Sequence, residues 1–251
     1  MSADDDAENV TETGEFASPP CFMHELDPAY SGRIAEDPDQ TVRDVMRWRR
    51  GERERLLAVR QSIDAAERAA LDHRITDHLT DLLGDLRGTT VGLYVPIRGE
   101  PRLTRFARSI VAGGGRCALP VVVERNRPLI YRTWSPGQRL VPGIWNIPCP
   151  DESAETVVPE IMIAPVLGFD SRGFRLGNGG GYFDRTLAIR NDSPQVIGVG
   201  YERLRIATIY PQPHDIAMTL VLTEDGARHP AGSDEKVQQE DRNSHATETP
   251  R

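Results

Sequence analysis

The chain is poor in the residues that build several common kinds of site. Its 251 residues include three cysteines, Cys21, Cys117 and Cys149, which lie far apart and form no Cys-x-x-Cys pair. This number and spacing argue against a disulfide framework and a cysteine-based metal site, and are typical of a reducing cytoplasm. The six histidines do not cluster, and no Ser-His-Asp order or nucleophile elbow is present.

Long apolar runs and a basic excess are also lacking. No stretch approaches the roughly 18 apolar residues of a membrane span, and the N-terminus lacks the basic and apolar regions of a signal peptide. We therefore expect no membrane partner. The formal charge is −8, but residues 1–40 hold eleven acidic residues and one arginine, so the remainder carries about +2. Nucleic-acid binders usually show a strong basic excess, and we expect no nucleic-acid partner.

Composition divides the chain into a core and two polar ends. The hydrophobic content of 38% is enough for one sizeable domain, which we place at residues 41–226. Residues 1–40 form an acidic extension expected to be mostly disordered, and residues 227–251 a disordered polar tail. Within the extension, the apolar segment Cys21–Tyr30 is expected to pack on the domain or on a partner chain.

Hydrophobic patterning predicts an α/β fold. Residues 41–83 favour helix with a break near Ser62 or Asp64, after which Leu71, Ile75, Leu79 and Leu82 recur at helical spacing. Strands are expected at residues 91–97, 117–123, 129–134, 161–167, 195–201 and 218–223, and shorter helices at 103–112 and 182–190. The β-α-β unit at residues 91–123 favours a parallel sheet, which binds ligands at the carboxyl ends of its strands.

The most unusual stretch is Phe169–Arg185, which places four glycines in five positions between an expected strand and an expected helix. Glycines let the backbone approach a ligand closely, and such a loop suits phosphate. The spacing is neither that of a dinucleotide-binding loop nor that of a P-loop. A plain glycine-rich turn capping a helix is the alternative interpretation.

Three further features carry two interpretations each. Arg49, Arg53 and Arg60 share one helix face, where they would form either a solvated stripe paired with nearby glutamates or a set of donors for a polyphosphate. Glu100, at the end of a strand, would serve a ligand or a structural salt bridge. Trp145, on a proline-rich loop, would fill the core or offer a flat surface to an aromatic ligand.

Five blocks, taken in order, resemble the 5-formyltetrahydrofolate cyclo-ligase family (5,10-methenyltetrahydrofolate synthetase), over roughly residues 45–226. The blocks are Arg49-x-x-x-Arg53, Tyr94–Glu100, Trp145–Pro150, Phe169–Arg185 and His214-Asp215. The long glycine motif is the most specific of the five.

The resemblance implies a three-layer α/β/α fold with a mostly parallel sheet, of the NagB/RpiA/CoA-transferase type. It also implies ATP-dependent conversion of 5-formyltetrahydrofolate, with or without a polyglutamate tail, to 5,10-methenyltetrahydrofolate, with Mg²⁺ required and ADP and phosphate released. In that reaction the formamide oxygen is phosphorylated, N10 attacks the activated carbon, and phosphate departs. Positioning and charge neutralisation are then the main tasks of the protein. We expect the protein to be a monomer or a homodimer.

The resemblance also implies a role for each matching residue. The ATP-binding residues would be Arg49, Arg53, Arg175, Leu176, Gly177, Asn178, Gly179, Gly180, Gly181, Tyr182 and Phe183. The folate-binding residues would be Val95, Glu100, Trp145, Asn178, Gly179, Gly180, Gly181 and Tyr182. Asp184 and Asp215 would bind magnesium, and Arg175, Tyr182 and Arg185 would be catalytic.

Four residues depart from the family pattern. Arg49 replaces a lysine, Gly180 stands where some members carry a lysine, Phe183 replaces a tyrosine, and Leu204 stands about where a glutamine is expected. Arg49 and Leu204 keep two alternatives open. One is a non-catalytic paralogue that binds folate or nucleotide, and the other is an ATP-dependent enzyme acting on another formyl-folate-like substrate.

Overall fold

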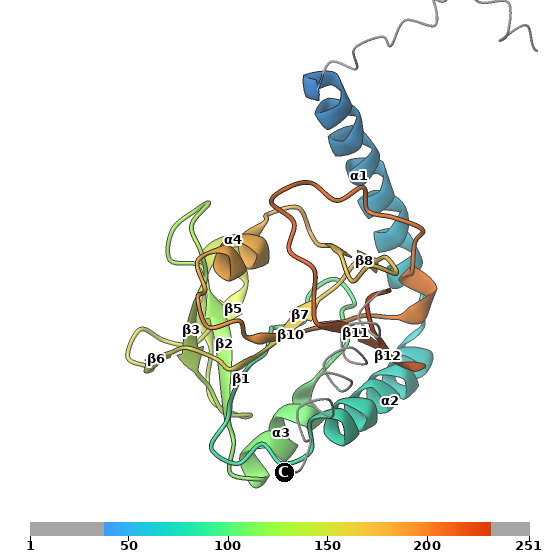
Figure 1. Ribbon diagram of the computed structural model, residues 1–251. Coiled ribbons are helices and arrows are strands. Elements are labelled where there is room, and N and C mark those ends of the chain that lie inside the picture. The colour runs from blue at the N-terminus through green and yellow to red at the C-terminus, as the bar shows by residue number, and fades with distance from the viewer. Residues whose placement is uncertain (1–37, 232–251) are drawn as a thin grey trace, which may run out of the picture. The chain divides into compact units, whose positions relative to one another are not determined.

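The computed structural model describes residues 38–231 (Figure 1). Of these, residues 44–231 belong to one compact unit and residues 38–43 to another. Only the start of the first helix is described for the smaller unit, so the account below concerns the larger one. The segment Cys21–Tyr30 lies outside the described residues, as does most of the expected acidic extension and polar tail.

The order of elements is that of an α/β protein. The helices are α1 (Pro38–Gln61), α2 (Ala65–Leu83), α3 (Thr104–Ala112) and α4 (Tyr182–Ala188), with two 3₁₀ turns, η2 (Ile144–Asn146) and η3 (Glu202–Leu204). The strands are β1 (Thr90–Gly92), β2 (Arg116–Val121), β3 (Ile130–Thr133), β4 (Val141–Pro142), β5 (Pro148–Cys149), β6 (Thr156–Val157), β7 (Ile161–Pro165), β8 (Gly168–Phe169), β9 (Arg175–Leu176), β10 (Gln195–Val199), β11 (Leu220–Thr223) and β12 (Gly226–Arg228).

Local chemistry explains the predicted break between the first two helices. The Asp64 carboxylate accepts hydrogen bonds from the amides of Ala66 and Glu67, both at 2.9 Å, and so caps the start of α2. Helix α2 ends at Gly84, whose φ of 55° favours glycine. Leu71, Ile75 and Leu79 are buried as predicted. Leu82 follows on the same face but is 38% exposed at the end of the helix.

The main sheet has eight strands in the order β12-β11-β10-β7-β1-β2-β3-β6. The five central strands, from β11 to β2, are mutually parallel. Strands β12, β3 and β6 pair antiparallel to their neighbours at the two edges. The predicted parallel β-α-β unit, formed by β1, α3 and β2, is therefore confirmed. The sequence pattern predicted no direction for β3, which runs antiparallel to β2.

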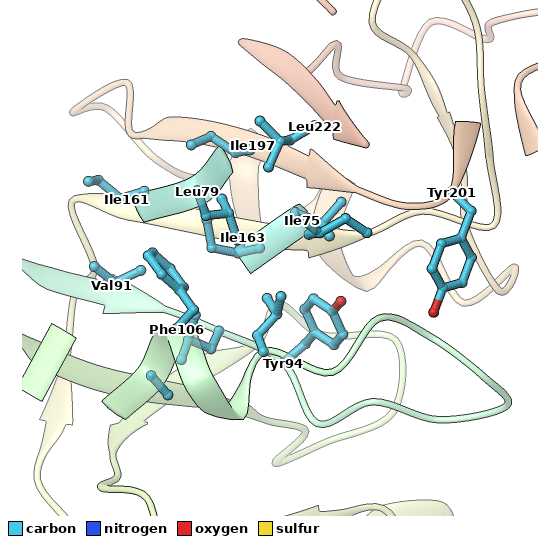
Figure 2. Packing of buried hydrophobic residues seen from close by; sticks show 14 of the residues in the cluster. Ile75, Leu79, Val91, Tyr94, Phe106, Ile161, Ile163, Ile197, Tyr201 and Leu222 are labelled. Atoms are coloured by element: carbon cyan, nitrogen blue, oxygen red, sulfur yellow. The ribbon is translucent and has the colours of Figure 1, made fainter. Parts of the chain in front are cut away.

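Both faces of the parallel strands are buried, which gives the fold its layers. Ile161 and Ile163 of β7 face one hydrophobic cluster, together with Phe106 of α3 and the buried face of α2. Met162 and Ala164, on the opposite face of β7, join a second cluster that includes Leu187 of α4. Figure 2 shows Ile75 and Leu79 packed beside Ile163, Ile197 and Leu222. The expected α/β class with a mostly parallel sheet and helices on both sides is confirmed.

Several boundaries differ from those expected. Strand β1 ends at Gly92, well before the expected Ile97, and the following residues turn away into a loop. Helix α1 begins at Pro38, inside the expected extension. Ala227 and Arg228 belong to β12 and pair with β11, so the expected tail began too early. Among residues 38–231, no helix is both long and apolar enough to cross a bilayer.

Candidate functional site at the carboxyl ends of the parallel strands

A cavity of about 460 Å³ opens at the carboxyl ends of β1, β2 and β7. The chain passes from β1 to β2 on one side and later returns to β7 on the other, so β1 lies at a switch in strand order. Such switch points are the usual ligand sites of open α/β sheets. Residues from all five sequence blocks line the cavity.

The glycine-rich loop between β9 and α4 forms one wall of this cavity. Gly179 and Gly181 have φ values of 96° and 64°, in the left-handed region that disfavours other residues. A Cβ on Gly180 would lie 2.8 Å from the ring of Tyr182. Gly179 and Gly181 thus allow the backbone path of the loop, and Gly180 leaves room for the ring of Tyr182. These roles go further than those of a plain glycine-rich turn that caps α4.

Two arginine–aspartate pairs line the cavity. Arg49 of α1 donates to both carboxylate oxygens of Asp215 and also to the carbonyl of Ile209. Arg175 of β9 forms an ion pair of 2.9 Å with Asp184 of α4. Asp184 in addition accepts a hydrogen bond from the amide of Ile216 at 3.2 Å. The four side chains, from distant parts of the sequence, make one charged cluster.

Arg53 adds a third positive charge that has no carboxylate partner among the described residues. Its Nε donates to the carbonyl of Gly177 at 2.9 Å, which ties α1 to the glycine loop. The solvated-stripe interpretation is wrong for Arg49, because that side chain is buried and Glu52 pairs with Arg55 instead. Arginines exceed aspartates in the cluster, so the cavity suits an anion.

Burial and charge shift the ionisation of this cluster. Burial alone would raise the pKa of Asp215, but hydrogen bonds from Arg49 and from the amide of Gln212 outweigh it and hold the pKa below its usual value. Burial lowers the pKa of Arg175 despite the nearby Asp184 and Asp215. Burial likewise lowers the pKa of Arg53, and the positive charge of Arg49 adds to this effect.

Glu100 also lines the cavity and is 3% exposed. One carboxylate oxygen accepts from the amide of Ile97 at 3.0 Å, and the other accepts from the Asn178 side chain at 3.2 Å. Burial raises the pKa of Glu100, against the lowering effect of these bonds and of Arg60. The structural-salt-bridge alternative holds in part, because Arg60 lies 3.8 Å away, yet the carboxylate also faces the cavity.

Aromatic side chains border the cavity beside the glycine loop. The rings of Trp145 and Tyr182 meet edge to face, with centroids 5.5 Å apart, and the guanidinium of Arg185 lies 4.8 Å from the Tyr182 centroid. Trp145 is 54% exposed and has a φ of 56°, so it does not fill the core. Its flat face is therefore available to a ligand.

Two residues assigned to the site do not line the cavity. Leu176 is buried in the hydrophobic cluster beside α2, so only its backbone is near the loop. Arg185 packs on Tyr182 and donates to the carbonyl of Gly180, so it supports the loop from outside the lining. Leu204, which stands about where a glutamine was expected from the family resemblance, is fully buried in the same hydrophobic cluster as Leu176.

The apolar wall of the cavity was not recognised from the sequence. Four of its members lie within two of the five sequence blocks but were given no role there; they are Ile97, Ile147, Pro148 and Cys149. The other members lie outside the blocks; they are Pro120, Val122, Leu129, Ile144 and Pro165. The position of Pro120 and Val122 at the end of the predicted second strand was the one available signal. Burial raises the pKa of the Cys149 thiol, which is typical of a packing role.

Comparisons with known proteins agree with this geometry. The sequence model of the 5-formyltetrahydrofolate cyclo-ligase family matches residues 45–224. The 5-formyltetrahydrofolate cyclo-ligase of Mycolicibacterium smegmatis is 34% identical over 177 residues, covering 67% of this chain and 89% of the relative. That of Haemophilus influenzae is 24% identical, covering 68% and 94%.

Solved structures give the same result for the fold. The 5,10-methenyltetrahydrofolate synthetase of Aquifex aeolicus superposes with a TM-score of 0.64 at 26% identity, covering 74% of this chain and 94% of that one. The synthetase of Mycoplasma pneumoniae superposes with a TM-score of 0.59 at 22% identity, covering 70% and 98%. On the match over most of its described residues, this chain belongs to the 5-formyltetrahydrofolate cyclo-ligase family.

Proposed function

We propose that this chain converts 5-formyltetrahydrofolate to 5,10-methenyltetrahydrofolate, using ATP and Mg²⁺ and releasing ADP and phosphate. The observation that carries the proposal is the composition of the cavity. Arginines, aspartates, one further buried carboxylate, and apolar and aromatic side chains all line this one cavity. A reaction that joins a polyphosphate to a flat, hydrogen-bonding ring system needs these features side by side.

The arginines of the cavity suit the phosphates of ATP. Arg53 has terminal donors free of carboxylates, and Arg49 and Arg175 are held in place by aspartates. Planar guanidinium groups bind phosphate oxygens in bidentate fashion. Arg175 lies nearest Asp184 and would neutralise charge on the transferred phosphate, which makes it the leading catalytic residue among the arginines.

The two aspartates suit a magnesium ion that arrives with the nucleotide. The described residues contain no group of three or more acidic, histidine or cysteine side chains that would hold a metal by themselves. Magnesium commonly takes one or two carboxylates and completes its shell with phosphates and water, so Asp184 and Asp215 fit. When bound there, the ion would draw negative charge from the phosphates.

The lining around Glu100 suits the folate. Glu100 would accept hydrogen bonds from ring N–H groups, and the amide of Asn178 holds that carboxylate in place. Val95 and the apolar wall would cover the ring, and Trp145 would face it beside Tyr182. Apolar walls also exclude water from an activated formyl group, which would otherwise be hydrolysed.

The remaining expectations belong to the same proposal. Arg185 would position Tyr182 by stacking on its ring. The protein is expected to be a monomer or homodimer. The sparse cysteines agree with a cytoplasmic enzyme. A polyglutamate tail on the folate is compatible with the opening of the cavity, which is lined by Arg98.

The test is a direct assay of both products. Purified protein incubated with ATP, Mg²⁺ and 5-formyltetrahydrofolate should form ADP together with the absorbance of methenyltetrahydrofolate, and neither product should form when any one component is omitted. Thermal stabilisation by the ligands without ADP would support a binding protein instead. A higher kcat/KM for another formyl compound would identify a different substrate.

A further inference from the structure

A buried arginine that does not line the cavity lies beside Glu100. Arg60, in the last turn of α1, is 0% exposed, and its Nε donates to the carbonyl of Arg98 at 3.1 Å. Both of its terminal nitrogens lack a hydrogen-bond acceptor among residues 38–231. A buried charge without a close partner is costly, so its retention calls for a reason.

The closest carboxylate to Arg60 is the one that faces the cavity. An oxygen of Glu100 lies 3.8 Å from Arg60 Nη2, and the two side chains are 2% exposed or less. At this separation the pair interacts through charge and makes no hydrogen bond. Each oxygen of Glu100 already accepts one bond, from Ile97 or Asn178, and each keeps a further lone pair.

Arg60 also holds the turn that carries Glu100. Arg98 has a φ of 49° and Gly99 a φ of 82°, so the turn is tightly wound. A Cβ on Gly99 would lie 3.7 Å from Arg60 Cγ and 3.6 Å from Arg68 Cζ. The turn thus rests on two arginines, of which only Arg60 is paired with Glu100.

We propose that Arg60 is a positioning residue: it keeps the Glu100 carboxylate charged and directed into the cavity, and thereby sets the affinity for a ligand with ring N–H donors. This inference rests on the proposed function for the identity of that ligand, a reduced folate. Because Arg60 does not line the cavity, it acts through Glu100 and leaves nucleotide binding unaffected.

The effect of pH follows from the groups around Glu100. Burial raises its pKa, and Arg60 from α1, Arg98 from the same turn, the Ile97 amide and the Asn178 side chain all lower it. Below its pKa the carboxyl is neutral and loses acceptor capacity, so folate affinity falls as pH falls. Removing the charge of Arg60 raises the pKa further, so this loss begins at a higher pH.

The first experiment follows Glu100 directly and needs no ligand. In protein labelled with ¹³C at glutamate carboxyl carbons, the Glu100 signal is assigned by its loss in Glu100→Gln. Its titration midpoint should move to higher pH in Arg60→Met and stay in place in the matched control Arg68→Met. Arg60→Lys keeps the charge and should restore the midpoint. An unmoved midpoint in Arg60→Met would overturn the inference, as would an equal shift in Arg68→Met.

The second experiment measures ligand affinity in the same variants. By calorimetry, Arg60→Met should bind 5-formyltetrahydrofolate at least about fivefold more weakly than the wild type, while ATP affinity with Mg²⁺ is unchanged. An equal loss for both ligands would indicate general damage and contradict the inference. If Arg60→Met does not fold, Arg60→Gln repeats both measurements. If the wild type binds no folate, the proposed function fails, and the Glu100 titration alone decides the role of Arg60.

Discussion

At the scale of single residues, the site depends on charges that are paired before any ligand arrives. Asp184 is held by Arg175 and by the amide of Ile216, and Asp215 is held by Arg49. Removing one partner of such a pair leaves the other as an unpaired charge in a largely buried position, which destabilises the protein. Isosteric changes are therefore the most informative, because they remove charge and keep shape.

Asp184→Asn should lower turnover far more than folate affinity. The amide keeps the size of the carboxylate but loses the charge proposed for magnesium, so we expect kcat to fall roughly a hundredfold. The folate dissociation constant should change less than about twofold, because Asp184 is proposed to act on magnesium and is not among the residues proposed to contact folate. Steady-state kinetics and calorimetry measure the two quantities.

The matched control is Asp192→Asn, an exposed aspartate after α4 that pairs with Arg190 and does not line the cavity. It should leave both quantities unchanged. Turnover of Asp184→Asn equal to that of the wild type at saturating Mg²⁺ would contradict the magnesium assignment.

Tyr201→Phe should destabilise the protein in a pH-dependent way. The Tyr201 hydroxyl donates to Asp72 at 2.9 Å in the core, where burial raises the pKa of Asp72. A carboxyl with a raised pKa costs stability when ionised, and this cost disappears as pH falls below the pKa. Losing the donor should therefore cost about 2 kcal/mol of unfolding free energy at neutral pH and less at an acid pH below the raised pKa of Asp72. Urea unfolding at the two pH values measures the difference.

Tyr94→Phe provides the control, since the Tyr94 hydroxyl is also buried but donates to the carbonyl of Pro101 at 2.8 Å. A carbonyl does not titrate in this range. The penalty of about 1 kcal/mol should be similar at both pH values. A Tyr201→Phe penalty that grows toward acid pH would show that Asp72 is not the titrating partner.

At the scale of elements, the glycine loop carries its function through shape. Gly180→Ala would place a Cβ 2.8 Å from the Tyr182 ring and so displace the ring from Trp145 and Arg185. We expect kcat/KM to fall at least about tenfold, because misplaced groups lose much of their effect. The unfolding free energy should change by less than about 1.5 kcal/mol, since the loop borders an open cavity.

Gly177→Ala, on the same loop, is the comparison for this prediction. A Cβ there meets nothing within 4 Å, its φ is not positive, and its carbonyl to Arg53 is kept. Its effect on kcat/KM should be several times smaller than that of Gly180→Ala. Equal losses in the two variants would indicate that the loop tolerates no side chain at all, whatever its contacts.

The elements were predictable where one face is strongly apolar. Ile161–Pro165 is apolar throughout and forms a central parallel strand, as such runs usually do. The direction of β3 was not predictable, because the residue pattern of Ile130–Thr133 carries no information on whether the strand runs parallel or antiparallel to its neighbour. Its antiparallel pairing with β2 is set by the tertiary structure near the edge of the sheet. Strand β12 was missed because three residues without large apolar side chains carry no periodic signal.

The candidate site was predictable where chemistry is local to a motif. Glycines and charged residues marked one wall of the cavity, and resemblance supplied roles for Arg49, Glu100 and Asp215. The apolar wall was not assigned to it, and Arg60 was considered only as a solvated residue or a polyphosphate donor, because the wall and the pairing of Arg60 with Glu100 arise from tertiary packing. Arg60 looks like a surface arginine in sequence, and only the turn folded over α1 makes it buried.

At the scale of the whole molecule, the topology gathers one charged cluster from three parts of the chain. Arg49 comes from α1, Arg175 and Asp184 from the two sides of the glycine loop, and Asp215 from the connection before β11. In the free protein, arginines and aspartates neutralise one another. Phosphates compete with the aspartates for the arginines, and magnesium competes with the arginines for the aspartates. Binding of ATP therefore frees the aspartates for magnesium, and binding of magnesium frees the arginines for ATP.

Magnesium and ATP should accordingly stabilise the protein more together than separately. In a thermal unfolding series, Mg²⁺ alone should give little increase in Tm, ATP with a chelator a moderate one, and the two together more than the sum. AMP with Mg²⁺ is the control, because it lacks the phosphates that would reach the arginines. A large increase from Mg²⁺ alone would show an all-protein metal site and contradict this account.

The exposed Trp145 beside Tyr182 gives the protein a built-in optical reporter. Its indole borders the cavity, whereas Trp48 packs edge to face on Tyr210 and Trp134 donates to the carbonyl of Gln138. A ligand entering the cavity would change the surroundings of Trp145 more than those of the other two. Changes in intrinsic fluorescence should therefore follow occupancy in real time, and Trp145→Phe would silence the signal while preserving an aromatic ring at the cavity mouth.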